Sequence, residues 1–246
     1  MNHKWDTNEH GNEEINTDFL ICVDPCFSAF IRVPFGVCYT GDVTSHYFSR
    51  QTEPETPPHQ AAKLHRIEAE CLEKTLSFAT GNGVFSRKNI DEGTRILLEN
   101  CDLASAQTIG DLGCGWGAVS CFLAITRHES QVFACDINFR ATQLARQNIE
   151  ASGTTNAFVW CGDGFSSVPD VTFDAILFNP PVRAGNVVIQ KLFDDCFRAL
   201  KTGGHLWIVL RTAQGAKSWA KKLESQFGNC ETVVIEKGYR VIDCAR

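Results

Sequence analysis

Long apolar segments are absent from this chain of 246 residues. No run approaches the roughly 18 apolar residues that a membrane-spanning helix needs. Residues 1–6 are polar and are not followed by the apolar h-region of a secretory signal. Internal repeats and low-complexity tracts are absent as well. We therefore expect a protein without membrane segments and with a cytoplasmic location.

An excess of positive charge is also missing from the chain as a whole. The formal net charge is −6, from 23 basic and 29 acidic residues. Residues 1–182 hold 12 basic and 23 acidic residues, a net −11, whereas residues 183–246 hold 11 and 6, a net +5. A basic C-terminal part can contact phosphates, but ordinary solvated helix faces give the same pattern. Charge alone therefore leaves nucleic-acid binding open.

Cysteine, in contrast, is abundant, with 12 residues. Their spacing is irregular and no secretory signal precedes them, so the disulfide framework of small secreted proteins is not expected. Several lie within apolar runs, where cysteine packs as a small hydrophobe: Cys121, Cys135, Cys161 and Cys196. We expect reduced and mostly buried thiols.

The first 45 residues are expected to form a partly disordered N-terminal extension. Residues 1–18 are polar and acidic, a composition typical of disorder, and residues 19–40 are apolar and β-prone. The extension and its border hold four residues of zinc-ligand types: Cys22, Cys26, Cys38 and His46. Their spacing lacks a compact second pair, so we expect no metal. The globular domain is expected over residues 46–246.

The segment that follows is expected to mix loop, helix and hairpin. Residues 49–60 are rich in proline and threonine, which indicates a loop. Apolar residues spaced three and four apart predict a helix over residues 61–75. A Gly-Asn-Gly turn predicts a β-hairpin over residues 76–86. Asp91 is expected to cap a short helix that ends near Leu98.

From residue 108 onward, strand patterns alternate with helix patterns. The predicted strands are residues 108–112, 131–136, 157–160, 173–178, 205–210, 231–235 and 239–244, and the predicted helices are residues 117–126, 139–152, 186–200 and 215–226. Such alternation implies right-handed crossovers and a mostly parallel sheet. The last two strands are too close for a crossover, so they must form an antiparallel hairpin. The pattern predicts a seven-stranded Rossmann-like α/β fold.

Acidic residues end three successive strands, and glycines follow the first. Asp111 precedes a glycine-rich turn formed by Gly113, Gly115 and Gly117. A carboxylate there repels a dinucleotide pyrophosphate and suits the cationic amino-acid end of S-adenosylmethionine (SAM). Asp136 can accept ribose hydroxyls, as an acid also does in NAD enzymes, and Asp163 can meet the adenine amino group. The three acids together predict a SAM site.

The tripeptide Asn179-Pro180-Pro181 follows the fourth predicted strand and is the expected catalytic site. The Asn179 side-chain oxygen and the Pro180 carbonyl are two acceptors on a turn stiffened by proline. Two fixed acceptors can hold a planar amino group with its nitrogen lone pair facing the SAM methyl group. Catalysis would then be mainly positioning, without a metal or covalent intermediate. The sequence predicts methyl transfer to an exocyclic or amide nitrogen.

The chain resembles the RsmC-like branch of the "small-domain" methyltransferases, which methylate guanine N2 in small-subunit ribosomal RNA. It is most similar to the short single-domain archaeal and bacterial members over residues 46–246. The matching motifs are Gly83-Val84-Phe85-Ser86, Asp91-Glu92-Gly93-Thr94, residues 111–117, residues 179–185, residues 214–218 and Gly238-Tyr239-Arg240-Val241. The resemblance implies a SAM-dependent enzyme with RNA as its partner.

The resemblance also suggests which residues contact the substrate. Most Asn-Pro-Pro amino methyltransferases have an aromatic residue fourth, whereas this chain has Val182. A flipped base would then stack on Phe178 or on Phe85, which is also expected beside the cofactor. Basic side chains expected at the RNA backbone are Arg183, Lys217, Lys221, Lys222 and Arg240. The lysines can equally be plain solvated charge.

Three other interpretations stay open. Glutamine N5 methyltransferases that act on release factors also use Asn-Pro-Pro, but followed by Tyr instead of Val182. An adenine N6 methyltransferase fits as well, since the adenine amino group suits the same two acceptors. A degenerate fold can also serve as a non-catalytic scaffold for RNA or protein, although the intact polar residues of both sites weigh against this.

Overall fold

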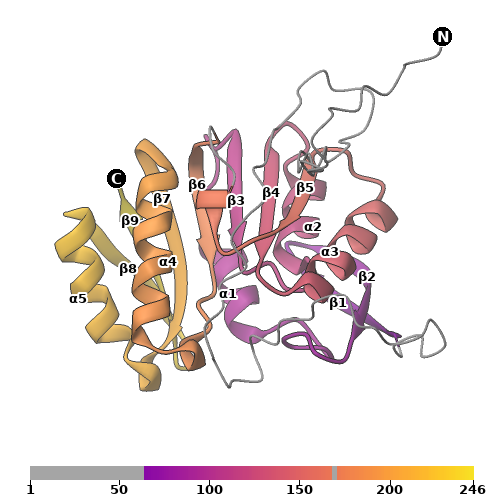
Figure 1. Cartoon of the computed structure of the whole chain (residues 1–246), viewed down its shortest axis with the longest axis horizontal. Helices are drawn as coiled ribbons and strands as arrows, with labels where there is room; N and C mark the ends of the chain where they lie inside the picture. Colours follow the sequence, from indigo (N-terminus) through magenta and orange to yellow (C-terminus); the bar gives the residue numbers. More distant parts are fainter. Residues whose placement is uncertain (1–63, 168–170) are drawn as a thin grey trace, which may run out of the picture. The chain divides into compact units, whose positions relative to one another are not determined.

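The computed structural model describes residues 64–167 and 171–246 (Figure 1). Its strands are β1 (Leu64–Cys71), β2 (Lys74–Gly81), β3 (Thr108–Leu112), β4 (Gln131–Asp136), β5 (Ala157–Cys161), β6 (Phe173–Phe178), β7 (Leu200–Arg211), β8 (Cys230–Glu236) and β9 (Tyr239–Ala245). Its helices are α1 (Glu92–Asn100), α2 (Ala118–Thr126), α3 (Phe139–Ser152), α4 (Asn186–Ala199) and α5 (Ala216–Phe227). None of these described helices is long and apolar enough to cross a bilayer. The expectations for the N-terminal extension, including its zinc-ligand types, concern residues outside the described part.

Seven strands form the main sheet in the order β5-β4-β3-β6-β7-β9-β8. The first five of these are parallel, whereas β9 runs antiparallel to both of its neighbours. The predicted Rossmann-like fold with an antiparallel C-terminal hairpin is therefore confirmed. Strand β7 starts at Leu200, earlier than the predicted residue 205.

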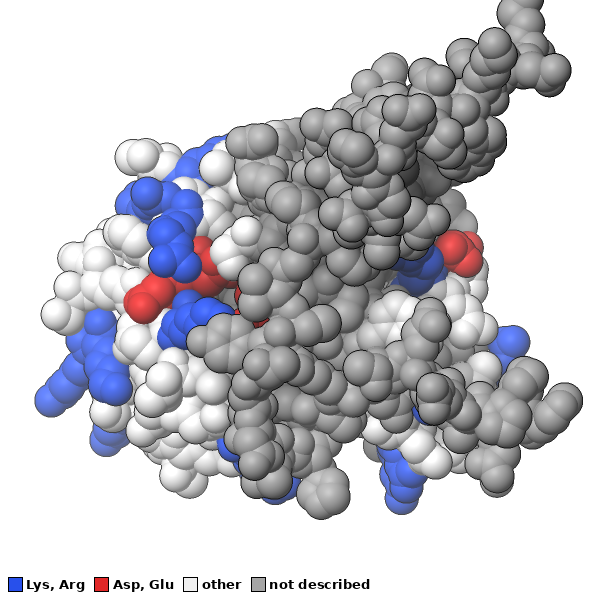
Figure 2. All heavy atoms as spheres, viewed as in Figure 1, with Lys and Arg blue, Asp and Glu red and all other residues white. Residues whose placement is uncertain are grey.

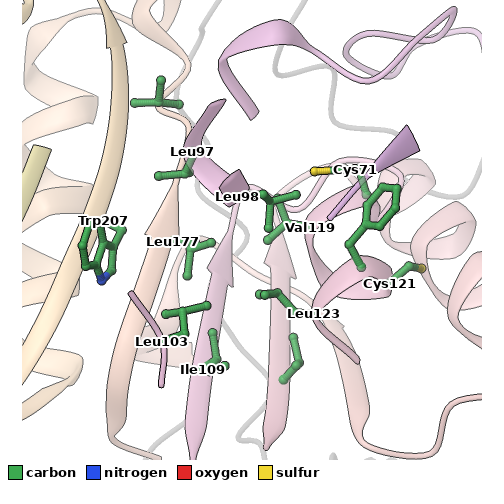
Figure 3. Packing of buried hydrophobic residues seen from close by; sticks show 14 of the residues in the cluster. Cys71, Leu97, Leu98, Leu103, Ile109, Val119, Cys121, Leu123, Leu177 and Trp207 are labelled. Carbon is green, nitrogen blue, oxygen red and sulfur yellow. The ribbon is translucent and has the colours of Figure 1, made fainter. Parts of the chain in front are cut away.

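Helices cover both faces of the sheet, with α1, α2 and α3 on one face and α4 and α5 on the other (Figure 1). Side chains of the central strands alternate between two cores. Ile109 and Leu177 belong to the first core, and Ile176 and Phe178 to the second. Figure 3 shows residues of α1 and α2 packed over the first core: Leu97, Leu98, Val119 and Leu123. Burial on both faces explains why these strands are nearly continuous apolar runs.

The first described segment differs from the prediction. The expected helix over residues 61–75 is wrong, because β1 and β2 pair there as an antiparallel hairpin. The expected hairpin over residues 76–86 is wrong too, since its first half belongs to β2. The true turn is Leu72-Glu73, where both residues have positive φ, 50° and 59°. Neither residue type favours that conformation, so the sequence carries no turn signal at the correct place.

The expectation of reduced thiols is wrong at one place. Cys230 of β8 and Cys244 of β9 lie directly opposite each other and form a disulfide. Cys121, Cys135 and Cys196 are buried free thiols, as expected, whereas Cys161 is exposed. The two disulfide partners are 14 residues apart in the chain, and only the hairpin pairing brings them together.

Candidate active site

A large cavity lies where the strand order reverses. From β3 the chain moves outward to β4 and β5, then returns to β6 on the other side of β3. Parallel sheets of this kind bind ligands beyond the carboxyl ends of the strands at that point. The cavity has a volume of about 740 Å³, within the range of ligand pockets. Its lining brings together eleven predicted residues: Phe85, Gly113, Gly115, Asp136, Asp163, Phe178, Asn179, Pro180, Pro181, Val182 and Arg183.

The glycines of the predicted cofactor turn have two different tasks. Gly113 and Gly115 line the cavity with φ of 70° and 56°, a conformation that glycine adopts without strain. Gly117 is not among the described residues that line the cavity. It starts α2, and a Cβ there would lie 3.0 Å from the Ala145 backbone on α3. Gly117 thus permits close packing of two helices.

Asp136 at the end of β4 holds the surrounding loops together. Its carboxylate accepts hydrogen bonds from the Gly115 backbone at 2.9 Å and the Asn138 backbone at 2.8 Å. Burial raises the pKa of Asp136. A carboxylate has about four lone-pair sites, so ribose hydroxyls can still be accepted. Asp163, by contrast, is exposed and forms an ion pair with Lys191 of α4.

Asp111 is the most deeply buried of the three acids, with 3% of its surface exposed. Its carboxylate accepts hydrogen bonds from the backbone N–H of Ser120, at 3.1 Å, and from the Ser120 hydroxyl. Burial raises the pKa of Asp111 to about 7. Asp111 lines a second, smaller cavity of about 60 Å³ between α1 and the glycine turn. An ammonium group that reached this cavity would therefore meet a carboxyl group that is partly protonated near pH 7.

Two side chains hold the backbone of segment 83–86 in the wall of the cavity. The Trp116 indole donates to the Phe85 carbonyl at 3.1 Å, and the Asn138 amide donates to the Gly83 carbonyl at 2.8 Å. Phe85 is 49% exposed and lines the cavity. Sequence reasoning missed both ties, because a single Trp or Asn in a loop has no recognisable spacing.

The Asn179 side chain is oriented by the start of α1. Its Nδ2 donates to Asp91 Oδ2 at 3.1 Å and to Thr94 Oγ1 at 3.0 Å. A carboxylate only accepts, so the atom facing Asp91 must be the amide nitrogen. The amide oxygen is thereby left as the acceptor of the site. Asp91 also caps α1 by accepting from the Thr94 backbone at 3.2 Å, and only this cap was predicted.

The two prolines form a tight turn directly after Asn179. The Val182 N–H donates to the Pro180 carbonyl at 2.9 Å, and Pro181 between them has φ −75° and ψ 78°. These values define an inverse γ-turn. The Pro180 carbonyl keeps one lone pair for a further donor. The predicted pair of acceptors is therefore compatible with the turn.

The predicted substrate residues lie in three different places. Val182 and Arg183 line the cavity. Phe178 lines it only at the back, because it is 1% exposed and packs edge-on against Phe193 with 5.8 Å between ring centres. A buried ring offers no stacking surface, so the expectation that a flipped base stacks on Phe178 is not met. Lys217 lies on α5 and is not among the described lining residues.

The remaining candidate, Arg240, lies in β9 and is likewise not among the described lining residues. Its guanidinium donates to the Thr232 hydroxyl of β8 at 3.5 Å. The cavity residues that were missed as site residues include three with polar side chains near the target loop: Arg211, Gln214 and Tyr239. Gln214 and Tyr239 belong to motifs that carried the family resemblance, and that was the available signal.

Comparisons with known proteins find a matching family model and several relatives. The family model "Methyltransferase small domain" matches residues 75–243. "Uncharacterized protein YbxB" of Bacillus subtilis is 35% identical over 202 residues, which cover 81% of this chain and 98% of that protein. Ribosomal RNA large subunit methyltransferase G of Streptomyces avermitilis is 33% identical over 165 residues, covering 65% of this chain and 43% of that protein. Ribosomal RNA small subunit methyltransferase C of Hahella chejuensis is 32% identical over 177 residues, 70% of this chain and 50% of that protein.

A solved structure shares the fold. It is the T. thermophilus 16S rRNA N2 G1207 methyltransferase (RsmC) in complex with AdoMet and guanosine. The TM-score is 0.67 at 23% identity, over 77% of this chain and 52% of that chain. The chain thus spans about half the length of the named ribosomal RNA methyltransferases that it matches.

Proposed function

Because the chain belongs to the methyltransferase small domain family and is a SAM-dependent methyltransferase, we propose that it methylates an exocyclic amino group, guanine N2 of small-subunit ribosomal RNA. The orientation of Asn179 carries this proposal. Its amide nitrogen is occupied by Asp91 and Thr94, so the site offers acceptors and suits a group that donates. The names of the RNA-modifying relatives support RNA as the substrate class.

In this mechanism the chain acts by positioning the target nitrogen. Asn179 Oδ1 and the Pro180 carbonyl accept the two N–H groups of the planar amine. The nitrogen lone pair is then directed to the methyl group that SAM supplies. Fixed geometry of this kind can provide much of the rate without a covalent enzyme intermediate. The turn at Pro181 and the bonds to α1 keep both acceptors in place.

The cofactor assignment uses the three acids and the glycine turn. Gly113 and Gly115 would let the cofactor approach the backbone, and Asp136 would accept the ribose hydroxyls. Asp163 would meet the adenine amino group, and Asp111 the ammonium end. The cavity lining supports the first four positions, and the small cavity supports Asp111. We keep residues 46–246 as the proposed extent of the methyltransferase domain.

A ribosomal RNA substrate requires the target base to leave its stack and enter the cavity. Phe85, which lines the cavity and is exposed, is the proposed stacking partner. Arg183 lies directly after the target loop, and Lys217 and Arg240 would contact the RNA backbone farther out. On the face in Figure 2, Lys and Arg side chains gather toward α4 and α5 with acidic side chains among them. Because charges of both signs are mixed there, RNA affinity would depend on individual basic side chains and not on a uniformly basic surface.

Transfer of labelled methyl groups tests the proposal directly. The chain is incubated with labelled SAM and either naked small-subunit rRNA or assembled small subunits, and the digested nucleosides are separated. We expect label in N2-methylguanosine. Label in N6-methyladenosine would keep the amino-group site but overturn the base. Label in glutamine of an added release factor would replace the RNA substrate altogether.

Substitution of Thr94 tests the orientation of Asn179. Thr94→Val removes one of the two acceptors that hold Asn179 Nδ2, and a hydrogen bond of this kind contributes about 1 kcal/mol. We expect kcat to fall about fivefold, while the Kd for SAM stays unchanged. Thr94→Ser keeps the hydroxyl and should retain nearly full kcat. Equal losses in both variants, or a loss confined to SAM affinity, would contradict this role.

The buried Asp111 predicts proton release when SAM binds. Burial raises the pKa of Asp111 to about 7, so much of it is protonated at pH 6.5, where an α-ammonium group is also protonated. Binding the ammonium favours the carboxylate, so we expect release of roughly three quarters of a proton there and tighter binding as pH rises from 6 to about 7. Closer to pH 8 the free ammonium group loses its own proton, which opposes further tightening. Calorimetry in buffers of different ionisation enthalpy measures this. Buffer-independent heats would contradict it, and Asp111→Asn should abolish the release.

A further inference from the structure

Arg211 lies at the cavity wall beside the target loop, yet the proposed methyl transfer gives it no task. It ends β7, which runs parallel to β6 with Ile208 opposite Phe178. Arg211 is therefore two residues farther along its strand than the level of Asn179, roughly 7 Å at the rise of a strand. Arg211 and Asn179 both line the large cavity. A cation thus stands one strand away from the position of the target amine.

Tyr239 holds this arginine in a fixed orientation. The two residues form a directly opposed pair between β7 and β9. The Arg211 guanidinium donates from Nε at 2.9 Å and from Nη2 at 2.6 Å to the Tyr239 hydroxyl, and its carbon lies 4.6 Å from the ring centre. The Tyr239 ring is 6% exposed and packs on Gly93 of α1, where a Cβ would approach it to 2.7 Å.

The charge of Arg211 is not neutralised by the pairing with Tyr239. A phenol is neutral, and Arg211 has no ion pair with a carboxylate within residues 64–167 and 171–246. Lys191 of α4, in contrast, is paired with Asp163, which lines the cavity. Arginine has five N–H donors in a planar fork, and Tyr239 engages the Nε side. The Nη1 and outer Nη2 donors remain as a second two-pronged edge.

We propose that this edge of Arg211 binds the phosphodiester group next to the target base. The inference rests on the proposed function, in which the substrate is RNA. A guanidinium fork matches two phosphate oxygens with two parallel hydrogen bonds. Because Tyr239 fixes the fork before binding, little side-chain freedom is lost on contact. Arg211 fixes the backbone of the target nucleotide, while Asn179 and Pro180 hold its base.

The test measures binding of naked small-subunit rRNA at several salt concentrations, with methyl transfer measured in parallel. Arg211→Ala should weaken binding about tenfold and reduce the slope of log K against log salt by about one, as expected for one lost phosphate contact. Tyr239→Phe keeps the charge of Arg211 but removes the hydroxyl that accepts its two hydrogen bonds. We therefore expect about threefold weaker binding with an unchanged slope. Arg66→Ala is the matched control, since Arg66 is exposed on β1 and lines neither cavity.

Three outcomes would overturn the assignment. Weaker binding of Arg211→Ala with an unchanged salt slope would mean that Arg211 stacks on a base. Unchanged binding would mean that Arg211 does not contact RNA. An equal loss of slope in Arg66→Ala would mean that any surface cation acts alike. If the wild-type chain neither binds nor methylates RNA, the proposed function itself fails, which is distinguishable from an active wild type with an unaffected Arg211 variant.

Discussion

Asn179→Ala should lower kcat about 100- to 1,000-fold, the usual effect of removing a preorganised polar group at a reacting centre. Without the side chain, the target amine loses one of its two acceptors and can rotate away from the methyl group. The Kd for SAM should change little, because Asn179 is held by Asp91 and Thr94 of the α1 start and not by the glycine turn. Single-turnover methyl transfer combined with calorimetric SAM titration measures both quantities.

A matched control is available in the same chain. Asn229 is exposed near the start of β8, and its side chain has no described hydrogen bond. Asn229→Ala should leave both kcat and SAM affinity unchanged. Loss of SAM affinity in Asn179→Ala would undercut the assigned role, since the residue would then belong to the cofactor site. Full activity of that variant would remove Asn179 from the mechanism.

Phe193→Ala should lower the free energy of unfolding by about 3–5 kcal/mol, the range for deleting a buried aromatic ring. Phe193 has no exposed surface. Its ring lies between Phe178 of β6 and Trp219 of α5, with centres 5.8 and 5.3 Å away. It therefore joins the strand that carries the target loop to two helices. The melting temperature should fall by about 10 °C for a domain of this size.

Thermal and urea unfolding followed by circular dichroism measure this loss. Val187, on the same helix, is 85% exposed, so Val187→Ala should change stability by less than about 0.5 kcal/mol. A loss below about 1 kcal/mol for Phe193→Ala would mean that the core around β6 relaxes to fill the space. The aromatic chain would then contribute little to holding the loop.

The βαβ region could be predicted from sequence because both of its signals are local. Strands such as β3, β4 and β6 were predicted with the bounds that the structure has, since burial on both faces leaves nearly continuous apolar runs. Helix α3 was predicted equally well, and it has a side-chain cap from Asn138 at its start and Gly153 at its end. The apolar spacing within α3 and the residues at its two ends therefore predict the same helix.

The hairpin β1–β2 could not be predicted because its turn breaks the local rules. Leu72 and Glu73 have positive φ, which their residue types rarely adopt. In addition, the spacing of the apolar residues resembles a helix face: Leu64, Ile67, Cys71 and Leu72. Tertiary contacts decide instead. Asn148 of α3 bonds both the N–H and the carbonyl of Ala79 in β2, at 2.7 and 2.9 Å. A contact across 69 residues leaves no trace in a sequence window.

In the candidate site, too, the features with local sequence signals could be predicted and those that depend on tertiary contacts could not. Residues at strand ends, such as Asp136 and Asn179, could be identified because parallel strands bring their carboxyl ends to one edge. The orientation of Asn179 could not, since it depends on Thr94, 85 residues earlier in the chain. Arg211 was missed for a similar reason, because its partner Tyr239 is a neighbour only through the pairing of β7 with β9.

The bonds that fix Asn179 also bear on how many methyl groups the proposed target can receive. With its amide nitrogen turned to Asp91 and Thr94, the site presents two acceptors and can be satisfied only by two N–H groups. An amine that already carries one methyl group has a single N–H left. Rebinding it would leave one acceptor unpaired, at a cost of about 1–3 kcal/mol. The hydrogen bonds that orient the first transfer therefore disfavour a second, and we expect the product to be a singly methylated base.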